Sequence, residues 1–438
     1  MSSLAMGFTG LAAILVLVAL RMPIGVALAL VAVVGLALVA SVDAVMSLVG
    51  SVPYEFAANW ELSAVPMFLL MGALTYRSGL TDSLFHALRI WLRFLPGGLA
   101  VATNIACAIF AAACGSSVAT TVAMGRIAIP EMLKARYNAG LAAAVCACAG
   151  TLGSMIPPSV MMIIYGAFTG QSVAALFMAG VFPGILTALV YAVMIVARAS
   201  IDPALAPRTR ETYSLAQKMR ALKRVWPLPA LVVAVIGGIY GGVATPTEAG
   251  AFGASCALVL ALTAGNISRR ILWEGVTEAL HGTATIFFVG LGAVLLTRFM
   301  SLSGVPDFIA DTITGHAVGP LLLILGASAV YLVLGCFLEP IGIMLLTLPV
   351  LVPALEKLGV NLIWFGILVV KLLEIGLITP PVGLNVFAAK TLIGDRISLE
   401  RIFAGVGWFL VCEALVLGLL IAYPEISLYL PRALGMMK

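Results

Sequence analysis

The sequence has few charged residues and almost no histidine. Its 438 residues include 24 lysine or arginine, 19 aspartate or glutamate and three histidine residues, so charged side chains make up 10% of the chain. Soluble globular proteins carry about 25% charged residues. Because 62% of the residues are hydrophobic, the chain is not a soluble globular domain. The net charge of +5 is small and dispersed, so we expect no nucleic-acid partner.

Motifs for nucleotide and metal chemistry are also missing. No lysine follows a glycine, which excludes the phosphate-binding loop G-x-x-x-x-G-K-[ST] and an ATP-driven motor. The sequence contains neither H-E-x-x-H nor G-x-S-x-G, and its histidines are far apart. The seven cysteines lie in apolar runs without C-x-x-C spacing, so we interpret them as small core residues. We expect neither an enzyme nor an organic cofactor.

Long apolar runs are instead abundant. A membrane-crossing helix takes about 20 apolar residues, and we place such segments at 4–20, 23–42, 62–80, 138–165, 172–197, 226–242, 246–264, 277–300, 361–390 and 403–423. These runs do not alternate as the strands of membrane barrels do, so we predict an all-α polytopic membrane protein. The first run lacks the basic start of a secretory signal and should be retained. Residues 43–61 contain three acidic residues and are predicted to form an interfacial helix.

Two further apolar stretches are interrupted in the middle. Residues 96–130 are broken by Cys114-Gly115-Ser116-Ser117 and have basic residues beyond both ends, which should therefore lie in the cytoplasm. Residues 318–356 are broken by the segment from Gly335 to Pro340 and have acidic or neutral flanks, so they should open to the opposite side. We predict two re-entrant helical hairpins. Irregular backbone at membrane depth needs polar partners, so the two tips indicate an enclosed polar site.

Three short motifs occur twice in the sequence, and the two copies of each are separated by a nearly constant number of residues. They are Ser78-Gly79 with Ser303-Gly304, Pro130 with Pro349, and Pro157-Pro158 with Pro380-Pro381. In both parts of the sequence the order is a helix, a Ser-Gly turn, a hairpin, a proline and a helix broken at Pro-Pro. Because the charges flanking the two hairpins predict that they open to opposite sides of the membrane, we predict that the two parts are inverted repeats. The halves are residues 1–197 and 226–438, joined by a basic cytoplasmic linker, 198–225. We interpret this linker as a plain connection, with a site for anionic lipid or a regulator as the alternative.

The Pro-Pro segments and the hairpin tips carry the residues best suited to binding ions. Two prolines within a span remove backbone donors, so each helix should unwind and expose carbonyl oxygens, which are ligands for a small cation. The candidates for this cation site are Ser116, Ser117, Gly150, Gly153, Glu339, Gly376, Thr379 and Asn385. The candidates for substrate contact are Ser117, Thr120, Pro158, Ser159, Arg298 and Pro381. The alternative is that these prolines and small residues only shape helix packing.

Ionisable residues within spans are costly and are functional candidates by default. Lys371 and Glu374 are three positions apart, and we interpret them as a mutually neutralising pair. Glu248 fits the first turn of a capped helix, and Glu413 fits an interhelical contact. Arg298 has no acid nearby in the sequence, so it is retained as a contact for a substrate carboxylate.

Over essentially its whole length, the chain resembles the large membrane subunit of tripartite ATP-independent periplasmic (TRAP) transporters. The segments that carry the resemblance are Arg21 to Gly25, Gly115 to Thr120, Ile129 to Met132, Gly150 to Gly153, Ile156 to Ser159, Thr245 to Ala249 and Glu374 to Asn385. The resemblance implies a sodium-coupled, elevator-type importer of an organic anion in the bacterial cytoplasmic membrane. Its implied partners are a small four-helix membrane subunit and a periplasmic substrate-binding protein. The cation candidates then become sodium ligands.

Two features qualify the resemblance. The large-subunit pattern begins at the start of the chain, so we expect the small subunit to be a separate polypeptide. Arg126 stands where a small polar residue is expected, which leaves the lining of that hairpin arm open. The alternatives are a stand-alone divalent-anion:sodium symporter and a passive channel. Nothing in the sequence selects one carboxylate over another.

Overall fold

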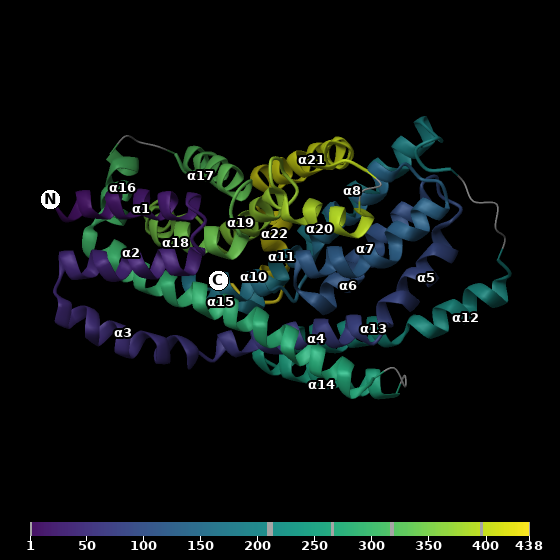
Figure 1. The fold of residues 1–438 in the computed structure, drawn as a ribbon, viewed down its shortest axis with the longest axis horizontal. Helices are drawn as coiled ribbons and strands as arrows, with labels where there is room; N and C mark the ends of the chain where they lie inside the picture. Colours follow the sequence, from purple (N-terminus) through teal and green to yellow (C-terminus); the bar gives the residue numbers. More distant parts are fainter. Residues whose placement is uncertain (1, 208–212, 264–266, 316–318, 395–396, 438) are drawn as a thin grey trace.

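The structure is a computed structural model that describes residues 2–207, 213–263, 267–315, 319–394 and 397–437. In this part of the chain the regular secondary structure is helical, without strands (Figure 1). Six of the described helices are long and apolar enough to cross a bilayer, or eight if two bent helix pairs each count as one span. The prediction of an all-α multi-pass membrane protein is therefore confirmed.

One group of helices, which we call the frame, includes the longest described helix, α15 (Arg269–Ser303). It comprises α1 (Ser3–Ala19), α2 (Ile24–Val39), α3 (Val42–Ala57), α4 (Ala64–Arg77), α13 (Pro227–Tyr240), α14 (Pro246–Thr263) and α15. α15 lies along α2 and α4, and α14 packs on α4 and α13. A Cβ on Gly292 of α15 would lie 2.7 Å from the Gly25 carbonyl oxygen, so this crossing depends on glycine. Helix α3 covers much of the predicted interfacial segment 43–61, whose position in the membrane stays a prediction.

The first interrupted stretch forms two helices that pack against each other, α6 (Gly98–Cys114) and α7 (Ser117–Lys134). They follow the 3-10 helix η1 (Glu61–Ser63), α4 and α5 (Leu80–Leu92). Gly115 joins the two arms with a φ of 66°, a conformation that favours glycine. The second arm continues past the expected end at Pro130, because a proline inside a membrane helix is tolerated when its surroundings satisfy the freed backbone groups.

The first Pro-Pro segment breaks its helix as predicted. The pieces are α8 (Ala139–Gly150), the short α9 (Leu152–Met155) and α10 (Val160–Thr169), and the Pro157-Pro158 peptide bond is cis. α11 (Val173–Ile201) follows, and the predicted linker contains a further helix, α12 (Leu215–Val225), which packs on α5. Residues 208–212 of the linker lie outside the described residues.

The second half repeats the same order of elements. Its helices are α16 (Val305–Gly315), α17 (Pro320–Gly335), α18 (Pro340–Lys357), α19 (Leu362–Gly376), α20 (Leu384–Ile393), α21 (Leu399–Ala422) and α22 (Glu425–Ala433). Gly79 and Gly304, in the matching Ser-Gly turns, have φ angles of 75° and 74°. The Pro380-Pro381 bond is cis, like its counterpart. The two halves thus share their turns and their helix breaks.

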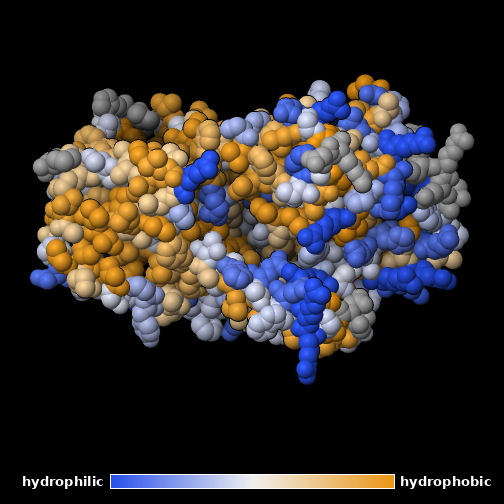
Figure 2. Space-filling view, viewed as in Figure 1, coloured by the Kyte–Doolittle hydropathy of each residue, from blue (hydrophilic) through white to orange (hydrophobic). Residues whose placement is uncertain are grey.

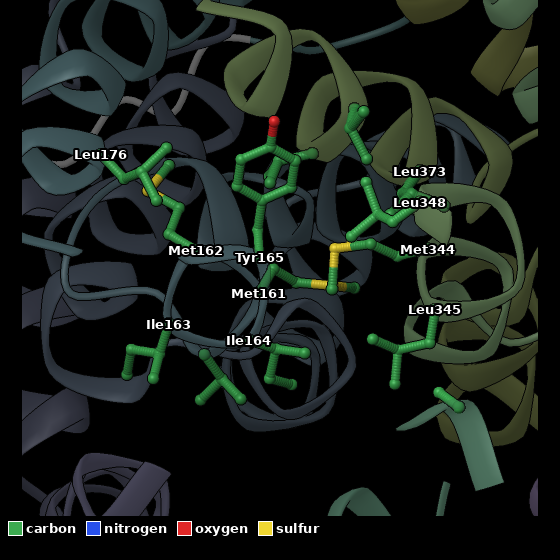
Figure 3. Close-up of a cluster of buried hydrophobic side chains, with 14 of the residues drawn as sticks. Met161, Met162, Ile163, Ile164, Tyr165, Leu176, Met344, Leu345, Leu348 and Leu373 are labelled. Atoms are coloured by element: carbon green, nitrogen blue, oxygen red, sulfur yellow. The ribbon is translucent and has the colours of Figure 1, made fainter. Parts of the chain in front are cut away.

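The halves also interlock. α20 packs against α7 and α8, while α10 packs against α18 and α19. Figure 3 shows Met161 and Tyr165 of α10 in one apolar cluster with Met344 of α18. The buried Tyr165 hydroxyl donates a hydrogen bond to the Leu362 carbonyl oxygen at 2.6 Å. Each broken helix is therefore fixed to the hairpin of the other half.

The surface separates into an apolar part and a charged part. Figure 2 shows apolar side chains over the end that carries α1 and α2, and hydrophilic side chains gathered toward the end that carries α5 and α12. On α2, Leu38 is 66% exposed and Val34 is 50% exposed. Such a continuous exposed apolar surface is what a lipid-facing helix presents.

Candidate ion and substrate site

The tip of the first hairpin meets the first broken helix at close range. The Val160 amide donates a hydrogen bond to the Gly115 carbonyl oxygen at 3.3 Å. A Cβ on Gly153 would lie 2.6 Å from the Ser116 carbonyl oxygen, and a Cβ on Gly150 would lie 1.8 Å from Thr121 Oγ1. The structure therefore brings Ser116, Gly150 and Gly153 together, and both glycines are required by the approach of α7.

A second contact joins this tip to the other half of the chain. The Ser117 hydroxyl donates a hydrogen bond to Glu374 Oε2 at 2.5 Å, across 257 positions of sequence. Ser117 Oγ also lies 2.9 Å from Ser154 Oγ of α9. Ser117 and Glu374 are 3% and 1% exposed. The first hairpin, the first broken helix and α19 therefore meet in one buried polar junction.

Three buried oxygen atoms on α7, α19 and α20 have no hydrogen-bond partner among the described residues. They are Glu374 Oε1, Asn385 Oδ1 and Thr121 Oγ1. Asn385 does use its other amide atom, because Nδ2 donates to the Ala147 carbonyl oxygen at 3.2 Å. Buried polar atoms are nearly always paired, and an unpaired one costs about 1–3 kcal/mol. Each of these oxygens is of the kind that accepts a hydrogen bond or binds a small cation.

The predicted neutralising pair of Lys371 and Glu374 is wrong. Lys371 Nζ forms an ion pair with Glu413 Oε2 instead, and it donates to Thr187 Oγ1 at 2.9 Å. The Tyr191 hydroxyl donates to the other oxygen of Glu413. Residues three apart on a helix face similar but not identical directions, so Lys371 reaches α11 and α21 while Glu374 reaches the hairpin tip. The interpretation of Glu413 as an interhelical contact is confirmed.

The predicted helix start at Glu248 is confirmed as well. Its carboxylate accepts hydrogen bonds from the Thr245 amide at 2.8 Å and from the Thr245 hydroxyl at 2.9 Å. Glu248 thus completes the N-terminus of α14.

In the second half, the hairpin and the broken helix meet through their backbones. A Cβ on Gly376 would lie 2.7 Å from the Gly335 Cα. Glu339 caps α18 by accepting from the amides of Ile341 and Gly342 at 3.3 and 3.2 Å, and it is exposed. Thr379 Oγ1 donates to the carbonyl oxygen of Ile375, on its own segment, at 2.6 Å. The tip contact predicted for Gly376 is present, whereas the side chains of Glu339 and Thr379 bond to neighbouring backbone.

The substrate candidates divide into two groups. Thr120, Pro158 and Ser159 are buried beside the first tip, where Thr120 Oγ1 donates to the Ser116 carbonyl oxygen at 2.8 Å and Ser159 caps α10. Arg298 is exposed on the frame helix α15, and Pro381 is exposed at the second break. The structure therefore groups the first-half candidates around one tip and leaves Arg298 and Pro381 on the surface.

A cavity of about 340 Å³ opens between this tip and the frame. Ser116 and Cys114 line its hairpin side, and Tyr76 of α4 with Glu278 of α15 lines its frame side. Arg126 lies elsewhere, in a charged cavity of about 580 Å³ that also contains Asp82, Arg89 and Arg224. Arg126, which stands where the family resemblance predicts a small polar residue, therefore does not line the tip cavity.

The cross-half contact of Glu374 was not predicted from the sequence. The available signal was its ionisable side chain within a predicted span, which marks a functional candidate. The lysine one turn away offered a local partner, and sequence spacing cannot show that this lysine bonds to Glu413 instead.

Comparisons with known proteins agree with this architecture. A crystal structure of the YdaH transporter of Alcanivorax borkumensis matches with a TM-score of 0.60 at 14% identity, covering 88% of this chain and 90% of that one, which supports the fold alone. The C4-dicarboxylate TRAP transporter large permease protein DctM of Pseudomonas aeruginosa is 38% identical over 387 residues, covering 87% of this chain and 89% of that protein. The sialic acid TRAP transporter large permease protein SiaM of Vibrio cholerae is 30% identical, covering 91% of this chain and 94% of that protein.

The family description "Tripartite ATP-independent periplasmic transporter, DctM component" matches residues 11–426. The resemblance of the sequence motifs is therefore confirmed, and the chain belongs to the DctM component family of the tripartite ATP-independent periplasmic transporters.

Proposed function

We propose that this chain is the large permease subunit of a sodium-driven importer of an organic anion in the bacterial cytoplasmic membrane. The observation that carries the proposal is the buried junction at the first hairpin tip, where Ser117 meets Ser154 and Glu374, and where Glu374 Oε1 has no partner among the described residues. Oxygen ligands at a helix break are the setting in which secondary transporters hold their coupling ion. Relatives named for C4-dicarboxylate and sialic acid support a carboxylate as the cargo class.

The proposed movement is that of an elevator. The two hairpins and both broken helices move as one body, because α10 packs on α18 and α19 while α20 packs on α7 and α8. The frame stays fixed, and the cavity that contains Ser116 and Tyr76 lies between frame and moving body, where a cargo would cross. Close contact across this boundary is possible because Gly72 of α4 has no side chain: a Cβ there would lie 2.9 Å from the Cys114 Cα.

The proposed domain organisation is two inverted halves, 1–197 and 226–438, with 198–225 as a cytoplasmic linker. In its support, the bases of the hairpins lie toward opposite ends of the molecule, with α5 near one and α16 near the other (Figure 1). At the first base, Arg89 forms an ion pair with Glu131 of α7. At the second, Lys357 of α18 pairs with Asp311 of α16 at 2.9 Å.

The proposed partners are a small membrane subunit and a periplasmic binding protein that delivers the anion. They follow from membership of a tripartite family, and the apolar surface of the frame leaves room for a membrane subunit. The cargo itself is defined only as an organic anion, because the binding protein makes the first selection in such a system.

The test is uptake into proteoliposomes that contain the permease with the small subunit encoded beside it. An inward sodium gradient and the cognate binding protein are added separately and together. The proposal expects accumulation only when both are present. Accumulation with sodium alone would establish a stand-alone symporter instead, and flux that needs neither would establish a channel.

A further inference from the structure

The charged cavity that contains Arg126, which we call the hairpin-base cavity, lies where three helices meet at the hydrophilic end of the molecule (Figure 2). Its volume is about 580 Å³. Arg126 and Lys134 reach it from α7, Arg89 from α5 and Arg224 from α12. α12 packs on α5, and α5 packs on α7. The cavity therefore joins the base of the first hairpin to the linker helix.

The described lining of this cavity carries more positive than negative charge. Four arginine or lysine side chains line it, against the two carboxylates of Asp82 and Glu131. Glu131 is shared, because it forms ion pairs with both Arg89 and Lys134. A cleft lined mainly by charges of one sign concentrates ions of the opposite sign. The hairpin-base cavity is thus suited to an anion.

Arg126 and Arg224 show which kind of anion fits. Both side chains are exposed, and neither forms an ion pair within the described part of the chain. A guanidinium group stays charged and can donate two parallel hydrogen bonds to a phosphate. Basic residues also act as topology signals, but that role does not require a shared cavity. Two such groups on different helices of one cavity therefore favour a ligand with phosphate oxygens.

We propose that the hairpin-base cavity binds a phosphate group, carried by an anionic phospholipid or present as a soluble ion, with Arg126 and Arg224 as its main ligands. Basic pockets at the cytoplasmic ends of membrane helices bind such headgroups. Arg126 belongs to the hairpin, whereas α12 leads into α13 of the frame. A phosphate held by both arginines connects hairpin and frame and restricts their relative movement. The binding is independent of the proposed function, whereas the restriction rests on it.

The test is phosphate binding to the purified full-length permease, measured by thermal unfolding in detergent. One arm titrates inorganic phosphate, as its potassium salt, against potassium chloride at constant ionic strength and pH. The other arm adds dioctanoyl phosphatidylglycerol, with the zwitterionic dioctanoyl phosphatidylcholine as its control. The wild-type protein should be stabilised saturably in at least one arm. Saturation by inorganic phosphate identifies the soluble ion as a sufficient ligand, and saturation by phosphatidylglycerol alone identifies the lipid.

Matched variants connect this binding to the cavity. Arg126→Gln combined with Arg224→Gln removes both guanidinium groups, so the half-saturating concentration should rise at least about tenfold, as expected when charge-assisted hydrogen bonds are lost. Arg126→Lys combined with Arg224→Lys keeps the charges without the paired donors and should give an intermediate value. Lys223→Gln removes an exposed charge of α12 outside the cavity and should leave the value unchanged.

Three results would overturn the binding site. They are an unchanged titration in the double glutamine variant, equal stabilisation by phosphatidylcholine, and stabilisation that rises without saturation in both arms. The restriction is tested by uptake into proteoliposomes that contain the effective probe. The double glutamine variant should then transport faster than wild type, and equal rates would refute the restriction while leaving the binding intact. Uptake that does not depend on sodium would refute the proposed function and leave the phosphate titrations unaffected.

Discussion

Gly335 at the end of α17 and Gly376 at the end of α19 meet backbone to backbone. A Cβ on Gly376 would lie 2.7 Å from the Gly335 Cα and 3.0 Å from the Gly335 carbonyl oxygen. A Cβ on Gly335 would lie 2.9 Å from the Gly376 Cα. Because neither backbone can yield as a flexible side chain does, this contact fixes the second hairpin against the second broken helix.

We expect Gly376→Ala to destabilise the permease by about 1–3 kcal/mol, the usual cost of overpacking. The added methyl group must displace backbone atoms of Gly335. Thermal unfolding in detergent measures the effect. The matched control is Gly326→Ala on α17, where an added Cβ meets no atom within 4 Å. Equal melting temperatures for the two variants would contradict a tight contact at this place.

The contact of Gly150 with Thr121 supports a second prediction. Gly150→Ala should lower stability, since its Cβ would lie 1.8 Å from Thr121 Oγ1. Adding Thr121→Ala removes that oxygen but leaves the Thr121 Cβ at 3.0 Å and the Ser117 carbonyl oxygen at 3.1 Å, so rescue should be partial. A double-mutant cycle of melting temperatures gives the coupling, which we expect between about 0.5 and 3 kcal/mol. Additive effects would show that the two residues are not in contact.

The regular parts of this fold were predictable because each depends on neighbouring residues. The run 246–264 became α14 (Pro246–Thr263), and Pro157-Pro158 marked the first helix break. Local sequence patterns do not predict the contact of a side chain whose partner lies far away in the sequence. Glu374 bonds to Ser117 across 257 positions, and no spacing rule contains that distance. The helix α12 was missed because its linker was interpreted from its charge alone.

The buried pair of Lys371 and Glu413 supports a third prediction. Lys371→Met leaves Glu413 buried without its counter-charge, so it should destabilise the permease by about 3–5 kcal/mol. Lys371→Met combined with Glu413→Gln removes both charges, and the double variant should melt at a higher temperature than the single one. Thermal unfolding again provides the measurement. A double variant less stable than Lys371→Met alone would argue that the charges do not form a pair.

The fourth prediction concerns which side of the membrane each hairpin base faces. Arg93 and Lys134 line one cavity, so the two ends of the first hairpin lie together. Single cysteines at these positions, in a background without the seven native cysteines, should both react with an impermeant thiol reagent from the cytoplasmic side. Cysteines at Asp307 and Lys357, which pair at the second base, should react from the periplasmic side. Labelling of Arg93 and Lys134 positions from opposite sides would exclude a re-entrant hairpin.

The last prediction is energetic. A divalent organic anion that enters a negative-inside cell works against about 2.3 kcal/mol per charge per 100 mV, or roughly 4.6 kcal/mol in total. Two sodium ions cancel the charge of such an anion, so voltage adds nothing to accumulation, and a third ion makes the cycle electrogenic. The sites proposed at the two hairpin tips account for two ions. We therefore expect at least two ions per anion.

Uptake into proteoliposomes at a fixed sodium gradient, with and without an imposed negative-inside potential, measures the number of sodium ions that accompany each anion. For a divalent cargo, acceleration by the potential indicates three or more ions, equal accumulation indicates two, and inhibition by the potential would contradict the expected minimum.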